Sequence, residues 1–114
     1  MALLKGTLDI LVLKTLSWGP MHAFEIISWL EARSDGHLAV ADAAFVQSVH
    51  RMEERGLVTA QWGTTKNDRQ ARYYRLTAAG RAHLGTEGRA LSDHVDAIAT
   101  VLAAKSAGRQ PPPR

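Results

Sequence analysis

The chain of 114 residues contains no cysteine, which excludes disulfides, thiolate-bound metals and cysteine nucleophiles together. It also lacks a long uncharged hydrophobic run, because the apolar N-terminal segment carries Lys5, Asp9 and Lys14 and stops at Gly19-Pro20. Such a segment is too short and too charged to span a bilayer, and it lacks the charge order and cleavage site of a signal peptide. We therefore expect a soluble, cytoplasmic protein with no membrane partner.

The features of enzymes are equally scarce. The sequence has no glycine-rich phosphate-binding loop and no nucleophile elbow. Its five histidines are scattered, and the i, i+4 pair of His83 and Glu87 has no third residue to complete a metal site. We expect no enzymatic activity, no metal and no other cofactor, and a small metal-assisted hydrolase ranks last among the functions considered.

Positive charge is in excess and unevenly placed. Fourteen Lys and Arg against eleven Asp and Glu give a net charge of +3 at pH 7. Residues 51–81 hold seven of the basic and three of the acidic side chains. A concentration of this kind is typical of proteins that bind a polyanion such as nucleic acid, although a solvated surface gives the same count.

The first half of the chain predicts three short helices. Apolar residues recur at helical spacing over residues 8–16, 23–33 and 43–55. Asp42 is the expected N-cap of the third helix, and Gly56 favours the left-handed exit at its end. The inward stripe of this helix is Phe45, Val49 and Met52.

After Gly56 the pattern becomes alternating, with Val58, Ala60 and Trp62 on one face of an expected strand. A polar loop separates this run from a second alternating one, ARYYRL at residues 71–76, so the pair predicts a hairpin. Three helices followed by a hairpin is the element order of a winged helix-turn-helix. We therefore expect a mainly α fold of the α+β kind, with this domain at residues 1–76.

A last helix is expected over residues 77–105, capped by Thr77, with an apolar stripe close to heptad spacing. The stripe extends past the domain, and burying four such side chains is worth about 6 to 12 kcal/mol before entropy costs. We expect it to form a homodimer, the alternative being that the helix folds back on its own domain. The proline-rich tail, residues 106–114, is expected to be disordered. The dimerisation stripe is Leu84, Leu91, Val95, Ile98 and Leu102.

Two segments carry a family resemblance: KGTLDILVLKTLSWGPMHAFEI at residues 5–26 and VHRMEERGLVTAQWGTTKNDRQARYYRLTAAGR at residues 49–81. They resemble the PadR family of bacterial transcriptional regulators, in its short, acidobacterial-type subgroup, and the similarity extends from Leu4 to Leu102. The resemblance implies a homodimeric repressor that binds double-stranded DNA. Its third helix would enter the major groove, its hairpin, the wing, would contact the flanking backbone or minor groove, and its last helix would dimerise.

The sequence departs from the family at the expected DNA surface. Members typically read Gly-Ser-Leu-Tyr-Pro where residues 43–47 read Ala-Ala-Phe-Val-Gln, so two hydroxyl groups are missing. At the start of the second helix, Phe24 stands where the family has tyrosine. The alternative function is therefore a winged-helix protein-interaction module that kept the fold and has lost sequence-specific DNA binding.

On the third helix, Gln47 and Ser48 lie in the first two turns, the part of a recognition helix that reaches base edges. Glutamine pairs with adenine and an alanine or valine methyl contacts the thymine methyl, so we expect an A/T-biased half-site unless Gln47 is merely solvated. Arg51, one turn further on, is expected to bind phosphate. His50 is a further candidate contact, or else forms a surface pair with Glu54.

The hairpin places three cations within seven residues around its loop. Phosphate contact needs little geometric precision and gains from counterion release, although a charged hairpin tip also serves solubility. Of the two adjacent tyrosines, one is expected to pack beneath the wing and the other to reach the DNA backbone, and the alternation alone does not decide which. The candidate DNA contacts of the wing are Lys66, Asn67, Arg69, Arg72 and Tyr73.

A two-fold dimer would hold its recognition helices about 34–36 Å apart, which implies a pseudo-palindromic operator. The sequence leaves open an unknown small-molecule effector. Some PadR relatives bind flat aromatic drugs between aromatic side chains at the dimer centre, but no aromatic residue follows Tyr74 here. Trp18 and Trp29 either line an interface groove or, as is more common for tryptophan at such positions, pack in the core or in the dimer contact.

Overall fold

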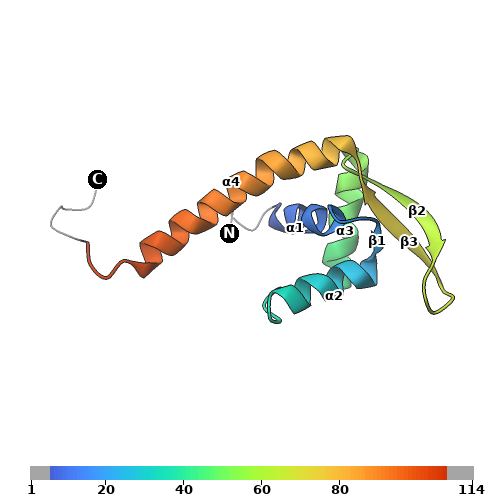
Figure 1. The fold of residues 1–114 in the computed structure, drawn as a ribbon, viewed down its shortest axis with the longest axis horizontal. Helices are drawn as coiled ribbons and strands as arrows, with labels where there is room; N and C mark the ends of the chain where they lie inside the picture. The colour runs from blue at the N-terminus through green and yellow to red at the C-terminus, as the bar shows by residue number, and fades with distance from the viewer. Residues whose placement is uncertain (1–5, 108–114) are drawn as a thin grey trace.

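The structure is a computed structural model that describes residues 6–107 (Figure 1). It is mainly helical with one small antiparallel sheet, so the predicted winged-helix class is confirmed. Of the tail predicted to be disordered, residues 108–114 lie outside the described residues, and that part stays a prediction. The elements in chain order are α1 (Thr7–Leu16), β1 (Met21–His22), α2 (Ala23–Arg33), α3 (Asp42–Glu54), β2 (Val58–Thr64), β3 (Gln70–Leu76) and α4 (Ala78–Ala103).

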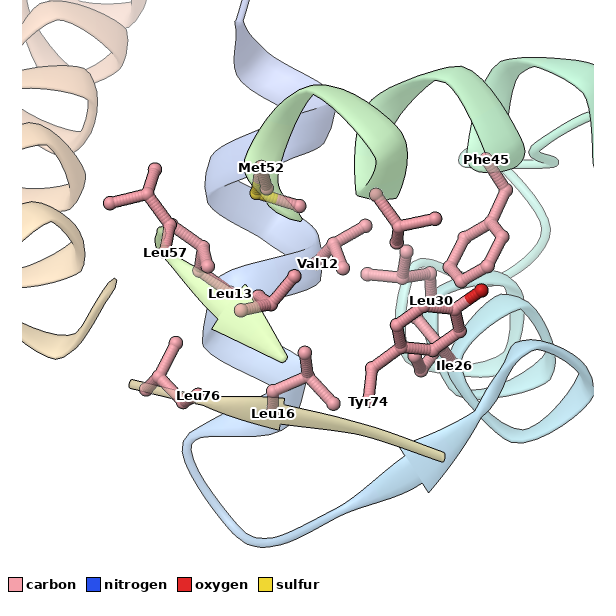
Figure 2. Close-up of a cluster of buried hydrophobic side chains, with 12 residues drawn as sticks. Val12, Leu13, Leu16, Ile26, Leu30, Phe45, Met52, Leu57, Tyr74 and Leu76 are labelled. Carbon is pink, nitrogen blue, oxygen red and sulfur yellow. The ribbon is translucent and has the colours of Figure 1, made fainter. Parts of the chain in front are cut away.

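Helices α1, α2 and α3 enclose one hydrophobic core, which the base of the wing closes (Figure 2). Phe45 on α3 and Tyr74 on β3 meet edge to face, with ring centroids 5.7 Å apart, and so join the third helix to the sheet. The predicted inward stripe of α3 is confirmed. The core residues are Val12, Leu13, Leu16, Ile26, Leu30, Phe45, Val49, Met52, Leu57, Val58, Tyr74 and Leu76.

Side chains cap the starts of α2 and α4 but not that of α3. At α2, the His22 ring accepts a hydrogen bond from the Glu25 amide while the Glu25 carboxylate accepts one from the His22 amide, which is a reciprocal capping box. At α4, the predicted cap Thr77 is confirmed, since its hydroxyl accepts from the Gly80 amide at 2.9 Å. The expectation for Asp42 is wrong: α3 has Ala41 as its N-cap, and Asp42 is its first residue, where a negative charge still favours the helix dipole.

The sheet contains the predicted hairpin and one strand more. Strands β2 and β3 pair antiparallel from Val58 opposite Leu76 to Thr64 opposite Gln70. The additional strand β1 pairs with β3, so the strand order is β1-β3-β2. Strand β1 was not predicted because its two residues are too few to show the alternation of apolar and polar side chains that indicates a strand. Strand β1 attaches the start of α2 to the wing.

The wing extends beyond the core. Along β2, Val58 is buried, Ala60 is half-buried and Trp62 is 66% exposed, although all three share the face that the alternation predicted. The helices support only the base of the hairpin, so the same face becomes solvent-exposed toward the tip.

Helix α4 begins beside the sheet, packs its first half along α1 and then projects away from the rest of the molecule (Figure 1). Its 26 residues correspond to about 39 Å of helix. No described helix is both long and apolar enough to cross a membrane.

Candidate nucleic-acid interface

The exposed face of α3 carries a mixed set of apolar and polar side chains. Gln47 and His50 are exposed as predicted, and Val46 beside them is exposed as well. His50 Nε2 lies 3.8 Å from Glu54 Oε2, so the surface pair considered from the sequence is present between two well-exposed side chains and contributes little to stability. Whether Gln47 and His50 contact DNA stays a prediction.

Ser48 does not belong to this face. It is fully buried, and its hydroxyl donates a hydrogen bond to Asp9 Oδ1 on α1 at 2.5 Å. The prediction that Ser48 reaches base edges is therefore wrong. Helical geometry explains the error, because Ser48 lies three residues after Phe45 and four before Met52, on the inward stripe.

Arg51 shares the same partner. Its Nη2 donates to Asp9 Oδ1 at 2.8 Å, and its side chain is 52% exposed while that of Asp9 is only 9% exposed. The predicted phosphate ligand is thus anchored at its inner side and open at its outer side. Sequence reasoning missed this role of Asp9. The available signal was its position three and four residues before the core residues Val12 and Leu13.

The wing tip presents open positive charge. The Thr65 amide donates to the Arg69 carbonyl at 2.8 Å, which closes the loop, and Asp68 adopts a left-handed conformation at its turn. The predicted contacts Lys66, Asn67 and Arg69 are all exposed. Within residues 6–107, neither Lys66 nor Arg69 has an acidic partner.

Arg72 differs from these tip cations. Its Nη2 donates to Glu53 Oε2 at 3.0 Å, and its guanidinium lies 5.8 Å from the centre of the Tyr74 ring. In the free protein the charge of Arg72 is therefore already balanced by a carboxylate of α3. This pairing lowers the net positive charge that Arg72 offers to a phosphate.

The structure assigns different places to the two adjacent tyrosines. Tyr74 packs in the core, and this burial raises the pKa of its hydroxyl, against the lowering effect of Arg72 and together with the raising effect of Glu53. Tyr73 is half-buried, packs edge to face on His22 and lies against Gly63. The tyrosine beneath the wing is therefore Tyr74, and Tyr73 stays the candidate DNA contact.

A groove separates the first turn of α2 from the wing. Phe24 lines one side of it and is 76% exposed. Lys66, Arg69 and Arg72 line the other side. The α2 side also includes His22 and the carboxylate of Glu25, which pair with each other at 3.6 Å. The groove therefore places an exposed phenyl ring and one carboxylate opposite three cations, and the cations are the groups that suit a phosphate backbone. Sequence reasoning noted the hydroxyl that Phe24 lacks and missed the groove, which needs the hairpin's position in space.

A second, apolar groove lies between α1 and α4. Of the predicted dimerisation stripe, Leu84 packs against the core of its own domain, and Leu91 and Val95 line the groove, with Val95 47% exposed. Beyond the groove, Ile98 is half-buried and Leu102 is 80% exposed. The described chain therefore leaves the outer part of the stripe without a covering element. The apolar side chains that line the groove are Ile10, Leu11, Leu84, Leu91 and Val95.

Trp18 and Trp29 pack on each other with ring centroids 5.0 Å apart. Lys14 Nζ lies 4.9 Å from the Trp18 ring, and the Arg33 guanidinium lies 5.7 Å from the Trp29 ring. Neither tryptophan lines the groove between α1 and α4. The two rings thus contact each other, but Trp18 remains 58% exposed, so it is not a core residue, and a role in a dimer contact stays a prediction. Among the described residues, no three His, Asp or Glu gather as a metal site would require.

Comparison with known proteins identifies the family. Residues 12–86 match the family model described as the transcriptional regulator PadR-like family. An uncharacterized protein X of Lysinibacillus sphaericus is 23% identical over 82 residues, which cover 72% of this chain and 75% of that protein.

Solved structures show the same fold. A transcriptional regulator from Clostridium thermocellum is similar with a TM-score of 0.75 at 18% identity, covering 88% of this chain and 97% of that one. A PadR-like transcriptional regulator from Bacillus cereus is similar with a TM-score of 0.75 at 17% identity, covering 92% and 100%. Because the family model spans well over half of the sequence, the chain belongs to the PadR-like family of transcriptional regulators.

Proposed function

We propose that this protein is a sequence-specific DNA-binding repressor that acts as a homodimer, by binding and without catalysis. The observation that carries the proposal is the groove between α2 and the wing, whose cationic side includes Lys66 and Arg69 with no acidic partner among the described residues. Side chains of this kind contact phosphates at any sequence and supply affinity through counterion release.

Specificity would come from α3. Gln47 is exposed in the second turn and can bond to adenine through its side-chain amide, and the neighbouring Val46 can contact a thymine methyl. An A/T-biased half-site follows. The remaining proposed contacts are expected to reach the DNA backbone rather than the base edges. They are His50, Arg51, Asn67, Arg72 and Tyr73.

The homodimer would form through α4. Its outer stripe, including Val95 and Leu102, has no cover within the described chain, and burial of apolar area is the main favourable term in such association. A two-fold dimer would place two α3 helices about 34–36 Å apart on one side of the duplex. Such a dimer occupying a promoter would repress it by excluding polymerase. A small-molecule effector that changes the affinity of the dimer for DNA stays part of the proposal, and no site is assigned to it.

A second candidate is an interaction module that has lost sequence-specific DNA binding. Two features favour it: exposed Phe24 and Val46 make the proposed DNA surface partly apolar, and Arg72 is paired with the carboxylate of Glu53.

Fluorescence anisotropy separates the two candidates. Labelled duplex from the gene's own upstream region and a random duplex of equal length are titrated with protein at several salt concentrations. The repressor proposal expects tighter binding to the upstream duplex throughout, with log Kd changing linearly with log salt concentration. Equal affinity for both duplexes at every salt concentration contradicts it and favours the second candidate.

A further inference from the structure

We propose that Asp9 is a positioning residue for DNA binding, which holds Arg51 in the orientation that contacts a phosphate. The inference rests on the proposed function and adds to it a residue of α1 that lies behind the interface.

The geometry is a three-residue network across α1 and α3. One carboxylate oxygen, Oδ1 of Asp9, accepts hydrogen bonds from both the Ser48 hydroxyl and Arg51 Nη2. Ser48 is fully buried, so it fixes the carboxylate from the inside. The carboxylate in turn fixes one nitrogen of a guanidinium that remains half exposed.

The exposed part of Arg51 keeps its capacity to bind. A guanidinium carries five N–H donors in a rigid planar fork, and Asp9 takes up one of them in the structure. The remaining donors can pair with phosphate oxygens, which guanidinium groups bind through two parallel hydrogen bonds. One cation can therefore bridge the buried carboxylate and a DNA phosphate.

The benefit of this arrangement is preorganisation. A long arginine side chain on an open helix face loses rotamer freedom when it binds, and that cost lowers affinity. Here the cost is met when the protein folds, because Asp9 and Ser48 already restrict the side chain. An opposing effect exists, since the negative charge of Asp9 repels DNA. If removal of the Asp9 charge weakens DNA binding, Asp9 acts by positioning Arg51. If removal strengthens DNA binding, Asp9 only neutralises Arg51.

A double-mutant cycle on the full-length protein tests the proposal. The variants Asp9→Asn, Arg51→Ala and their combination are compared with wild type by anisotropy on the upstream duplex, across a range of salt concentrations. We expect Asp9→Asn to weaken binding by up to about tenfold, the equivalent of one immobilised side chain. In the Arg51→Ala background the same change is expected not to weaken binding, because only the repulsion between Asp9 and DNA is then removed. Both single variants should reduce the salt slope by about 0.9 for each phosphate that the protein no longer binds.

Two outcomes overturn the proposal: tighter DNA binding by Asp9→Asn, or an equal loss with and without Arg51. Glu31→Gln is the charge control, because it removes one exposed negative charge from α2 at a residue that has no ion pair among the described residues and is not a proposed DNA contact. It should not weaken binding.

Folding is monitored by circular dichroism and thermal melting. If Asp9→Asn does not fold, Ser48→Ala replaces it in the cycle, since it keeps both charges and removes only the hydroxyl that fixes the carboxylate. It should weaken binding in the presence of Arg51 and not in its absence, and the opposite pattern overturns the proposal. A wild-type protein with no preference for the upstream duplex overturns the proposed function and this inference together. A clear preference with an additive cycle overturns this inference alone.

Discussion

Gly80 packs its α-carbon directly against the carbonyl oxygen of Leu57, so that a β-carbon at Gly80 has no room. The contact lies where α4 starts and the chain from α3 enters β2. Thr77 reinforces the junction, because its amide donates to the same Leu57 carbonyl at 3.1 Å and its hydroxyl lies 2.7 Å from the Gly56 carbonyl oxygen. The direction in which α4 leaves the domain is set at this point.

Gly80→Ala is therefore expected to destabilise the protein, although alanine is the better helix former. The added methyl group must displace backbone, and overpacking of this kind costs about 1–3 kcal/mol. Thermal melting at fixed protein concentration measures the change. Gly85→Ala is the matched control in the same helix: a β-carbon there meets nothing within 4 Å, so it should stabilise the helix by about 0.5–1 kcal/mol. Equal melting temperatures for the two variants would falsify the packing argument.

Ser48 and Gln47 are neighbours in sequence, but we expect substitution of Ser48 to change stability and substitution of Gln47 to change base preference. Ser48→Ala removes a buried hydrogen bond to a carboxylate, which should lower the free energy of unfolding by about 1.5–3 kcal/mol. Gln47→Ala should leave stability unchanged and relax base preference at one operator position. Chemical denaturation and binding to a set of single-base operator variants measure the two effects. A base-specific effect of Ser48→Ala with unchanged stability would contradict the assignment.

Substitution of each wing cation should lower the affinity for DNA by an amount that depends on whether the cation already has an acidic partner. Lys66→Ala and Arg69→Ala should weaken binding to all sequences alike, with the salt slope reduced by about 0.9 per phosphate. Arg72→Ala should have a smaller effect, because Glu53 already balances that charge. Glu53→Gln should strengthen binding by releasing Arg72. Anisotropy across salt concentrations provides the comparison, and a larger loss of affinity for Arg72→Ala than for Arg69→Ala argues against this order.

The α4 stripe should control the oligomeric state. Ile98→Glu places a charge within the stripe and is expected to shift a dimer toward monomer in analytical ultracentrifugation, since a buried unpaired charge opposes association. Thr86→Glu, on the exposed opposite side of the same helix, should leave the dimer intact. A monomeric wild-type protein, or identical sedimentation of the two variants, would count against dimerisation through α4.

Sequence patterns predicted the parts of this fold that depend on local periodicity. The stripe of Phe45, Val49 and Met52, the hairpin and the Thr77 cap each follow from residues that are close together in the sequence. The features that sequence patterns missed arise between elements. Asp9 gained its partners only when α1 packed on α3.

The error at Ser48 has the same origin. A polar residue near the start of a recognition helix suggested a DNA contact, whereas the burial of α3 against α1 decided its place. Likewise, the ion pair of Arg72 joins residues 19 positions apart, which no short-range pattern detects. Local sequence thus located the candidate interface and did not reveal which of its cations are already paired.

The central claim is that two copies, joined through α4, bind one operator with paired α3 helices and wings. Hydroxyl-radical footprinting of the upstream duplex, combined with native mass spectrometry of the complex, tests it most directly. The account predicts two protomers per duplex and two protected half-sites with centres about 34–36 Å apart. A single protomer on the DNA, or protection without a two-fold pattern, would contradict it.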